Sequence, residues 1–340
     1  MTVRRGFSVT ELMMCVATCA LLGCVLIVGG ARPRGLASQS QSLDNLRQIG
    51  SVTRSYGADH ADRMWGFTWR PDVPVQSEWP DIRAHAGIDA FTAAGAQAID
   101  LLRRRTNTPN FPIPFSWVPH ILYSHLVLAD YMNAPMPMSV FVAPGDRNRR
   151  RWSENITAFR NGQLQPQPEP NPDNWRWSYS SSYELPVAWF APDAVTSTTG
   201  GVVQGGAQNQ YQLVAPTGGG LAQLGGRLLT DVRHPANKVL MYEQSQWQGA
   251  RRDVYFMADH ARVGVVMADG STAVRPTVQA NRGFQPAAPT NASPTFVTYS
   301  PAPWEPTVPT SGTGVPAYYR FTRSGLRGRD FDGQEVPWQP

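Results

Sequence analysis

Four ionisable side chains lie near one another in the last third of the chain: Asp253, Asp259, His260 and Asp269. Carboxylates and an imidazole are groups that bind divalent cations or transfer protons in enzymes. No nucleophile elbow, phosphate-binding loop, HExxH pattern or cysteine cluster accompanies them in the sequence, so we predict that the chain is not an enzyme. A calcium site that uses Asp259 and Asp269 is an open alternative, although the sequence has no EF-hand spacing there. We expect no other metal and no cofactor.

The elements that must position these residues are short strands. Runs rich in β-branched and aromatic residues predict strands at Lys238–Glu243, Asp253–Met257, Val263–Met267 and Ser271–Val274. Asp269 and Gly270, between the last two runs, predict a two-residue hairpin turn. Asp269 then has a structural role in the turn, and His260 can hydrogen-bond the backbone at a strand end. We therefore expect an antiparallel sheet.

The N-terminal region contains a long apolar segment. Residues 12–31 carry no charge, and as a helix they span about 30 Å, the hydrocarbon thickness of a bilayer. A cleaved signal peptide, cut near residues 29–31, is one interpretation. The run is longer than such a segment needs, however, and Glu11 lies just inside the apolar segment that starts at Phe7, where an unpaired carboxylate is costly unless it snorkels to the headgroups. We therefore predict a membrane-spanning helix that is retained.

The sequence RRGFSVTELM, residues 4–13, resembles the processing site of type IV prepilins and type II secretion pseudopilins. In that family a prepilin peptidase cuts after the glycine, here Gly6, and methylates the new N-terminal residue, here Phe7. The resemblance implies that Glu11 meets the α-amino group of Phe7 of a neighbouring subunit. It also implies three partners (prepilin peptidase, other pilin or pseudopilin subunits and inner-membrane lipid) and a single-pass inner-membrane protein. The head would lie in the periplasm, and assembly would give an extracellular or periplasmic filament.

An amphipathic continuation of this helix follows a Gly/Pro-rich kink at residues 29–35. Apolar residues recur with a period of about 3.6 up to Tyr56, which predicts a helix that ends near Gly57 and packs one face on the head. Asn45 to Gly50 reads NLRQIG and resembles the "NLKQIG" of large prepilin-like proteins typical of planctomycetes.

Two further segments resemble the heads of those proteins. His260, followed after eight residues by Asp269 and Gly270, is similar to their His…Asp-Gly signature, which commonly has nine residues at this spacing. Residues 140–146 resemble a strand and turn that often reads Cys-Pro-x-Asp. Ala143 replaces the cysteine, so the disulfide usual at this place is absent.

The resemblance implies an α+β, pilin-like fold, with a long N-terminal helix, transmembrane in its first half, on an antiparallel sheet with long loop insertions. The insertions are expected at residues 161–174 and 196–226, which are low in complexity. The predicted divisions are a leader at 1–6, an assembly helix at 7–31, its amphipathic continuation at 32–60, a head at 61–285 and a proline-rich, extended surface region at 286–340. Further helices are expected near residues 90–104 and 121–132, with His120 and His125 as structural residues.

The composition narrows the classes of function. Of the 340 residues 41% are hydrophobic and only 16% are charged, so a sizeable core is expected. The net charge of +5 comes from scattered arginines without a basic stripe, which argues against a nucleic-acid partner. All three cysteines fall within residues 15–24, which excludes a disulfide framework in the rest of the chain. The eleven tryptophans can stack on glycans, but we favour a role in the core.

Two classes of function follow from these observations. The first is a prepilin-like structural subunit of a type IV pilus or a type II secretion pseudopilus. The second is a signal-anchored periplasmic binding protein or a metal-dependent enzyme that uses the Asp/His cluster.

Overall fold

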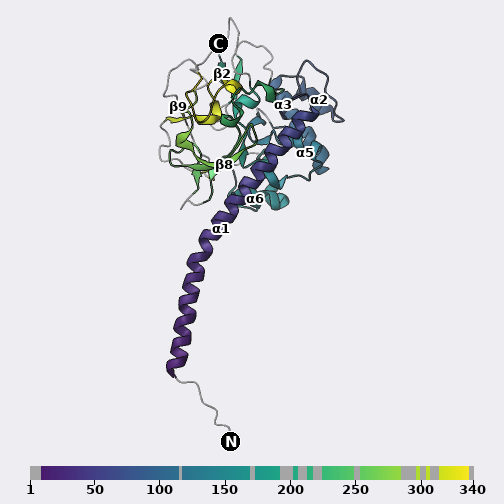
Figure 1. Ribbon diagram of the computed structural model, residues 1–340. Coiled ribbons are helices and arrows are strands. Elements are labelled where there is room, and N and C mark those ends of the chain that lie inside the picture. Colours follow the sequence, from purple (N-terminus) through teal and green to yellow (C-terminus); the bar gives the residue numbers. More distant parts are fainter. Residues whose placement is uncertain are drawn as a thin grey trace.

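One helix of 51 residues, α1 (Val9–Asp59), organises the molecule. The computed structural model describes residues 9–114, 117–168, 173–191, 202–205, 213–216, 224–248, 253–284, 296–298, 304–306 and 314–336. The first part of α1 projects from a globular head, and the last part runs across that head (Figure 1). We call residues 9–36 the free half and residues 42–59 the packed half. The helix continues through Gly29, Gly30 and Pro33, so residues 32–59 continue the same helix, as predicted.

An antiparallel sheet lies under the packed half, as predicted, but the predicted strand at Asp253–Met257 is not one of its four strands. Its strand order is β1, β4, β7, β8. The strands are β1 (Tyr183–Glu184), β4 (Val239–Glu243), β7 (Arg262–Met267) and β8 (Thr272–Pro276). All residues of β4 are buried, because α1 covers one face of the sheet and aromatic side chains from the C-terminal part of the chain cover the other.

The predicted hairpin joins β7 to β8, but its loop has three residues instead of two. The amide of Met267 donates to the carbonyl of Ser271 (2.8 Å), and the amide of Gly270 donates to the carbonyl of Met267 (2.8 Å). Gly270 has φ +85°, the left-handed value that closes a three-residue hairpin loop after a type I turn. The sequence pattern Asp-Gly thus located the turn correctly but not its length.

Short helices form one side of the head, next to the end of α1 (Figure 1). Asp89 caps α3 by accepting from the amides of Phe91 and Thr92, and this helix agrees with the predicted one. The predicted helix over 121–132 is two helices. Between them the amides of Val127 and Leu128 donate to the carbonyls three positions back, those of Ser124 (3.2 Å) and His125 (2.9 Å), as in a 3₁₀ turn. The helices are α2 (Pro80–Ala86), α3 (Ala90–Thr106), α4 (His120–Tyr123), α5 (Leu126–Met132), α6 (Arg147–Glu154) and α7 (Ile156–Arg160).

Smaller elements complete the described chain. The 3₁₀ turns are η1 (Ser139–Phe141), η2 (Asn174–Tyr179), η3 (Val187–Trp189), η4 (Leu229–Asp231), η5 (Pro235–Asn237), η6 (Thr277–Gln279), η7 (Tyr318–Phe321) and η8 (Gly325–Arg327). Two-stranded antiparallel pairs are β2 (Val202–Gly205) with β3 (Leu213–Pro216), β5 (Ser245–Gln246) with β6 (Val254–Tyr255), and β9 (Phe296–Thr298) with β10 (Gly314–Pro316). Most of the predicted loop insertion at 196–226 lies outside the described residues.

Residues 140–146 do not form the predicted strand, but they do contain the predicted turn, in which the amide of Asp146 donates to the carbonyl of Ala143 (3.0 Å). They pass from η1 into a turn, and Asp146 is the N-cap of α6, accepting from the amide of Arg149 (3.0 Å). A carboxylate at this position satisfies an amide that the first turn of the helix leaves without a partner. The apolar run at residues 140–143 is short, and a short apolar run is compatible both with a strand and with another buried conformation.

The C-terminal region is also different from the prediction. Residues 314–336 do not lie extended on the surface, because their aromatic and aliphatic side chains are buried in the core, among them Tyr319, Phe321, Leu326 and Phe331. The prolines that suggested an extended segment lie mostly in residues 286–313, and most of those residues are outside the described part of the chain. The structure places residues 314–336 within the head.

Within the described part of the chain, no helix is long and apolar enough to cross a membrane. The predicted transmembrane first half of the helix is therefore wrong, and so is the predicted location as a single-pass inner-membrane protein. Length does not limit α1, which has 51 residues, but its described residues are not apolar enough over the thickness of a bilayer.

Candidate functional site

The free half of α1 exposes large apolar side chains. Val9 and Met14 are 74% and 75% exposed, and Met13 and Val16 are similar. Val9, Met13 and Val16 are four and three residues apart, so they form one stripe along the helix. Figure 1 shows this half extending away from the head, so none of the head covers the stripe. An apolar stripe of this kind is a surface for contact with another molecule.

The three residues predicted for processing and assembly lie at the start of this helix. Gly6 and Phe7 fall outside the described residues. Glu11 is the third residue of α1, and its side chain also lies outside what the structure describes. A carboxylate in the first turn of a helix is favoured by the partial positive charge of the helix N-terminus.

The packed half presents one face to the sheet, and the NLRQIG segment supplies it. Leu46 and Ile49 are fully buried, and a Cβ added at Gly50 would lie 3.0 Å from Val266 of β7. A Cβ added at Gly264 of β7 would lie equally close to Leu46. These two glycines let the helix backbone approach the sheet closely. The resemblance to the post-membrane helix of large prepilin-like proteins thus falls on residues that dock the helix on the head.

A buried polar cluster fixes the position of the helix on the sheet. The Ser42 hydroxyl bonds a carboxylate oxygen of Glu243 (2.5 Å) and lies 2.9 Å from the hydroxyl of Tyr183. Glu243 also accepts from the amide of Gly264 (2.7 Å), and Asn45 donates to Tyr183 (3.3 Å). Burial raises the pKa of the Glu243 carboxyl, and the bonds from Ser42 and Gly264 oppose that rise.

The substitution Glu243→Gln is expected to gain stability relative to the parent chain as the pH rises. Because the pKa of Glu243 is raised in the folded chain, the stability that this group contributes is present at low pH and is lost as the pH rises through the raised pKa. The amide of the variant does not titrate. Urea unfolding of both chains at several values between about pH 4 and pH 8 measures the difference in the free energy of unfolding.

Glu154→Gln is the matched control for this experiment, because it replaces an exposed carboxylate of α6. A difference between Glu243→Gln and the parent chain that stays constant over this pH range would contradict the assignment of a buried, proton-binding carboxyl group.

The His…Asp-Gly residues do not form one site. His260 lies just before β7 and Asp269 just after it, so the six-residue strand, about 20 Å long, separates them. Asp269 accepts from the amide and hydroxyl of Ser271 (2.9 and 2.7 Å) within its own turn. Its carbonyl accepts from Arg54 of α1 (2.9 Å), and a Cβ at Gly270 would meet that guanidinium at 2.7 Å. The Asp-Gly pair thus docks the hairpin on the packed half of α1.

The candidate calcium ligands are also apart. Asp259 accepts from the hydroxyl of Tyr318 (3.0 Å) next to His260, at the other end of β7 from Asp269. Among the described residues, no group of three or more His, Cys, Asp or Glu side chains is placed to hold a metal ion. The geometry therefore does not bring Asp259 and Asp269 to one cation.

Two buried histidines, His120 and His125, were predicted to be structural and were given no functional role. His120 stacks on Phe190 (4.8 Å between centroids) and contacts Phe67 edge-on, and His125 lies against Phe141 at 4.5 Å. Burial lowers the pKa of each imidazole to about 3, so both are neutral at physiological pH. This placement agrees with the prediction that they are structural.

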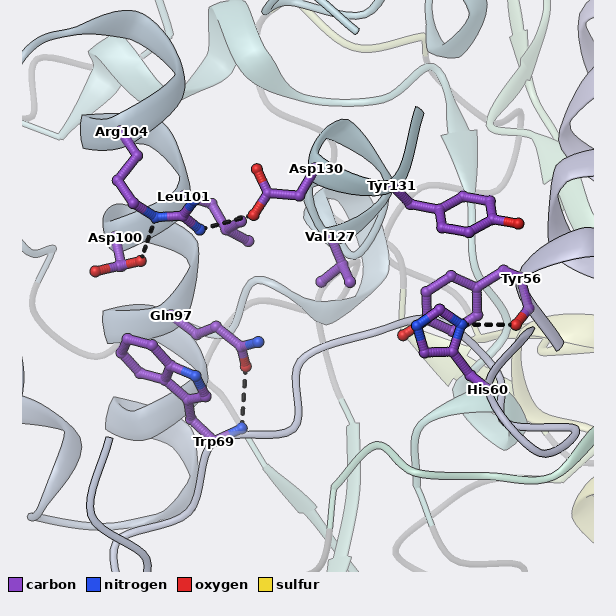
Figure 2. A pocket seen from close by; sticks show the side chains of 10 residues that line it. All are labelled: Tyr56, His60, Trp69, Gln97, Asp100, Leu101, Arg104, Val127, Asp130 and Tyr131. Atoms are coloured by element: carbon purple, nitrogen blue, oxygen red, sulfur yellow. Dashed lines mark hydrogen bonds and ion pairs between the residues drawn. The ribbon is translucent and has the colours of Figure 1, made fainter. Parts of the chain in front are cut away.

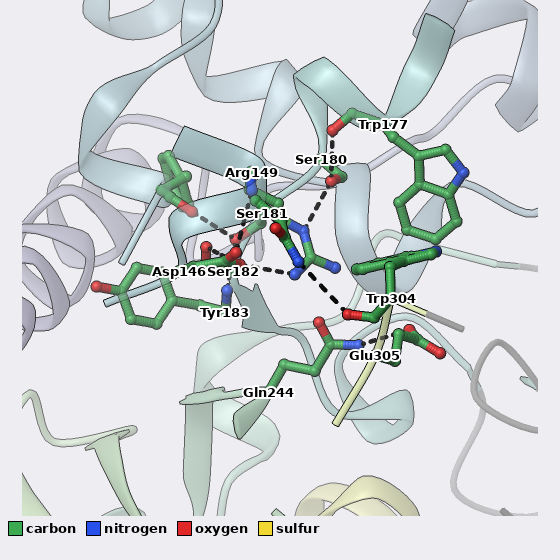
Figure 3. A network of polar contacts seen from close by, with 12 residues as sticks. Asp146, Arg149, Trp177, Ser180, Ser181, Ser182, Tyr183, Gln244, Trp304 and Glu305 are labelled. Atoms are coloured by element: carbon green, nitrogen blue, oxygen red, sulfur yellow. Dashed lines mark hydrogen bonds and ion pairs between the residues drawn. The ribbon is translucent and has the colours of Figure 1, made fainter. Parts of the chain in front are cut away.

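A second buried network was not foreseen from the sequence (Figure 3). Arg149 donates to Asp146 (2.8 Å) and to the hydroxyl of Ser180 (2.9 Å), and Ser182 donates to Asp146 (2.8 Å). The guanidinium also lies over the rings of Trp177 and Trp304. In the sequence Arg149 is one of the scattered arginines, and its neighbours Arg150 and Arg151 are charged as well. Only the distant serines and tryptophans reveal that Arg149 is buried.

The tryptophans serve mainly as core residues. Trp65, Trp152 and Trp189 are fully buried, and the other seven in the described segments are buried or partly buried. Trp65 and Trp189 also use their indole N–H groups, on the hydroxyl of Thr53 (2.8 Å) and the carbonyl of Val239 (2.7 Å). These contacts agree with the interpretation favoured from the sequence.

No protein-family model matches the chain, and no curated protein or solved structure matches it. The prepilin resemblance therefore rests on the sequence motifs alone. The geometry adds one observation to them, the exposed apolar stripe on the free half of α1.

Proposed function

We propose that the chain is a prepilin-like structural subunit, processed after Gly6 by a prepilin peptidase and assembled through α1 into a type IV pilus or a type II secretion pseudopilus. The observation that carries this proposal is the free half of α1. It presents an apolar stripe at Val9, Met13 and Val16 that the head does not cover. Burying such side chains contributes about 1.5–3 kcal/mol each, so the stripe favours association with other helices.

The packed half supports the same function. Its docking through Ser42, Leu46 and Gly50 holds the head to the helix, so a subunit held by its free half carries the head with it. In such an assembly, the free halves form the centre and the heads lie outside. Glu11, near the start of the stripe, is then placed to pair with the α-amino group of Phe7 of a neighbour, which neutralises two charges within an apolar surrounding.

The N-terminal sequence and intact mass of the protein from its own host test the processing step. We expect a chain that begins at N-methylated Phe7, lacking the first six residues of the printed sequence. The variant Gly6→Val is expected to keep its leader, because the peptidase of the resembled family cuts after glycine. A chain that begins at Met1, or one that begins near Arg32 as after signal-peptide cleavage, would contradict the proposal.

A further inference from the structure

A pocket of about 270 Å³ lies on the head beside the C-terminal end of α1. Its walls come from α1, α3, α5 and the segment that follows α1, as Figure 2 shows. The pocket lies at the opposite end of α1 from the apolar stripe. A ligand bound in the pocket would therefore not contact the surface that is proposed for assembly.

Aromatic rings form one wall of the pocket. The imidazole of His60 stacks on Tyr56 with 3.9 Å between centroids and 8° between planes, and Tyr131 meets both rings edge-on. Nδ1 of His60 lies 2.8 Å from the carbonyl of Tyr56, and the Tyr131 hydroxyl donates to Asp59 (2.5 Å). These bonds hold the rings in place, so the wall is preformed.

Trp69 lies on the other side of the pocket (Figure 2). Gln97 holds the chain there, because its side-chain oxygen accepts from the amides of Thr68 (2.7 Å) and Trp69 (3.0 Å). Within the described residues, the side-chain nitrogen of Gln97 has no hydrogen-bond partner. The pocket therefore combines flat apolar surfaces with an N–H donor that is available to a ligand.

The charges in the pocket are balanced. Arg104 bonds Asp100 (2.9 Å) and Asp130 (2.8 Å), and Arg105 lies 3.7 Å from Asp130. Two carboxylates thus face two guanidinium groups, so the site offers no unpaired charge to an ionic ligand. The carboxylate and guanidinium groups still present acceptors and donors at its edge.

We propose that this pocket binds one neutral sugar ring of a glycan. The apolar C–H face of a pyranose can lie against Trp69 or the Tyr56–His60 stack, while its hydroxyl groups bond Gln97 and the Asp100–Arg104–Asp130 group. Ligand sites commonly have this combination of apolar walls and a few converging polar groups. A cation would be expected to need an unpaired carboxylate, and an anion an unpaired arginine.

Saturation-transfer NMR on the purified full chain tests this proposal with maltose, cellobiose, lactose and N,N′-diacetylchitobiose as probes. The chain is kept dispersed in a detergent without a sugar headgroup, because a sugar detergent would compete for the pocket. We expect saturable binding of at least one disaccharide. Absence of saturable binding for all four, or binding of choline or inorganic phosphate at this pocket instead, would overturn the proposal.

Two variants locate the binding. Gln97→Glu keeps an oxygen for the amides of Thr68 and Trp69 and replaces the N–H donor with a charged carboxylate oxygen, so the backbone contacts are expected to persist while the donor is lost. Trp69→Ala removes an aromatic wall. Each is expected to weaken the affinity about tenfold, the effect of losing about 1.4 kcal/mol. Phe91→Ala is the control, since this partly buried ring lies on α3 outside the pocket. Unchanged affinity in both pocket variants would overturn the proposal.

Discussion

Arg320→Met is expected to lower the free energy of unfolding by about 3–5 kcal/mol. Arg320 is buried in the core and pairs with the buried carboxylate of Glu184, with Nε 3.1 Å from it. The guanidinium also bonds the hydroxyl of Tyr255 and lies 5.3 Å from the ring centre of Phe256. Methionine fills much of the same volume but leaves Glu184 as a buried charge without its cation. Urea unfolding of the two chains at neutral pH measures the difference.

Arg47→Met is the matched control, because Arg47 pairs with Asp44 on the exposed side of α1. Exposed pairs contribute about 0–1 kcal/mol, so this variant is expected to unfold close to the parent chain. The double variant Glu184→Gln, Arg320→Met is expected to recover part of the loss, because no unpaired charge stays in the core. A single Arg320→Met variant as stable as Arg47→Met would contradict the buried pair.

Glu11→Ala is expected to abolish assembly while the head stays folded. Glu11 lies 31 residues before Ser42, the first buried residue of the packed half, which corresponds to about 45 Å along a helix. Its replacement therefore cannot reach the contacts between α1 and the sheet. In the assembly proposed above, it removes the only carboxylate in the free half and leaves the α-amino group of a neighbour unpaired in an apolar surrounding. The filament fraction recovered by shearing, followed by immunoblotting, measures assembly.

Asp44→Ala is the matched control for Glu11→Ala, since it removes an exposed carboxylate from the packed half of the same helix. We expect it to assemble as the parent chain does. Circular dichroism and urea unfolding of both variants check that the head is folded. Normal assembly of Glu11→Ala, with a folded head, would contradict the role proposed for this residue.

The local patterns predicted the elements around α1 well. The period of 3.6 in residues 43–56 identified the packed face of the helix, and the β-rich runs identified β4, β7 and β8. These signals depend on neighbours in the sequence, so a single chain is enough to detect them. The spanning prediction was wrong, however, because the described part of the chain contains no helix that is apolar enough over the thickness of a bilayer.

The candidate site was predicted only in part. The sequence indicated Gly6, Phe7 and Glu11 by resemblance, and their roles stay predictions. His260 and Asp269 were grouped because they lie close together in the sequence and resemble a family signature. In the structure the strand β7 lies between them, so their side chains are far apart. The pocket beside Tyr131 had no sequence signal, because its walls come from four segments that only the fold brings together.

The sequence by itself determined the long helix, its docking face, the antiparallel strands and the place of the hairpin, because each follows from spacing over a few residues. The tertiary structure decided which polar residues are buried and with which partners. Arg320 pairs with Glu184 across 136 positions, and Arg149 meets Ser180 across 31. Such pairs form only when distant segments pack together, and the stabilisation of a buried charge depends on the partner that packing supplies.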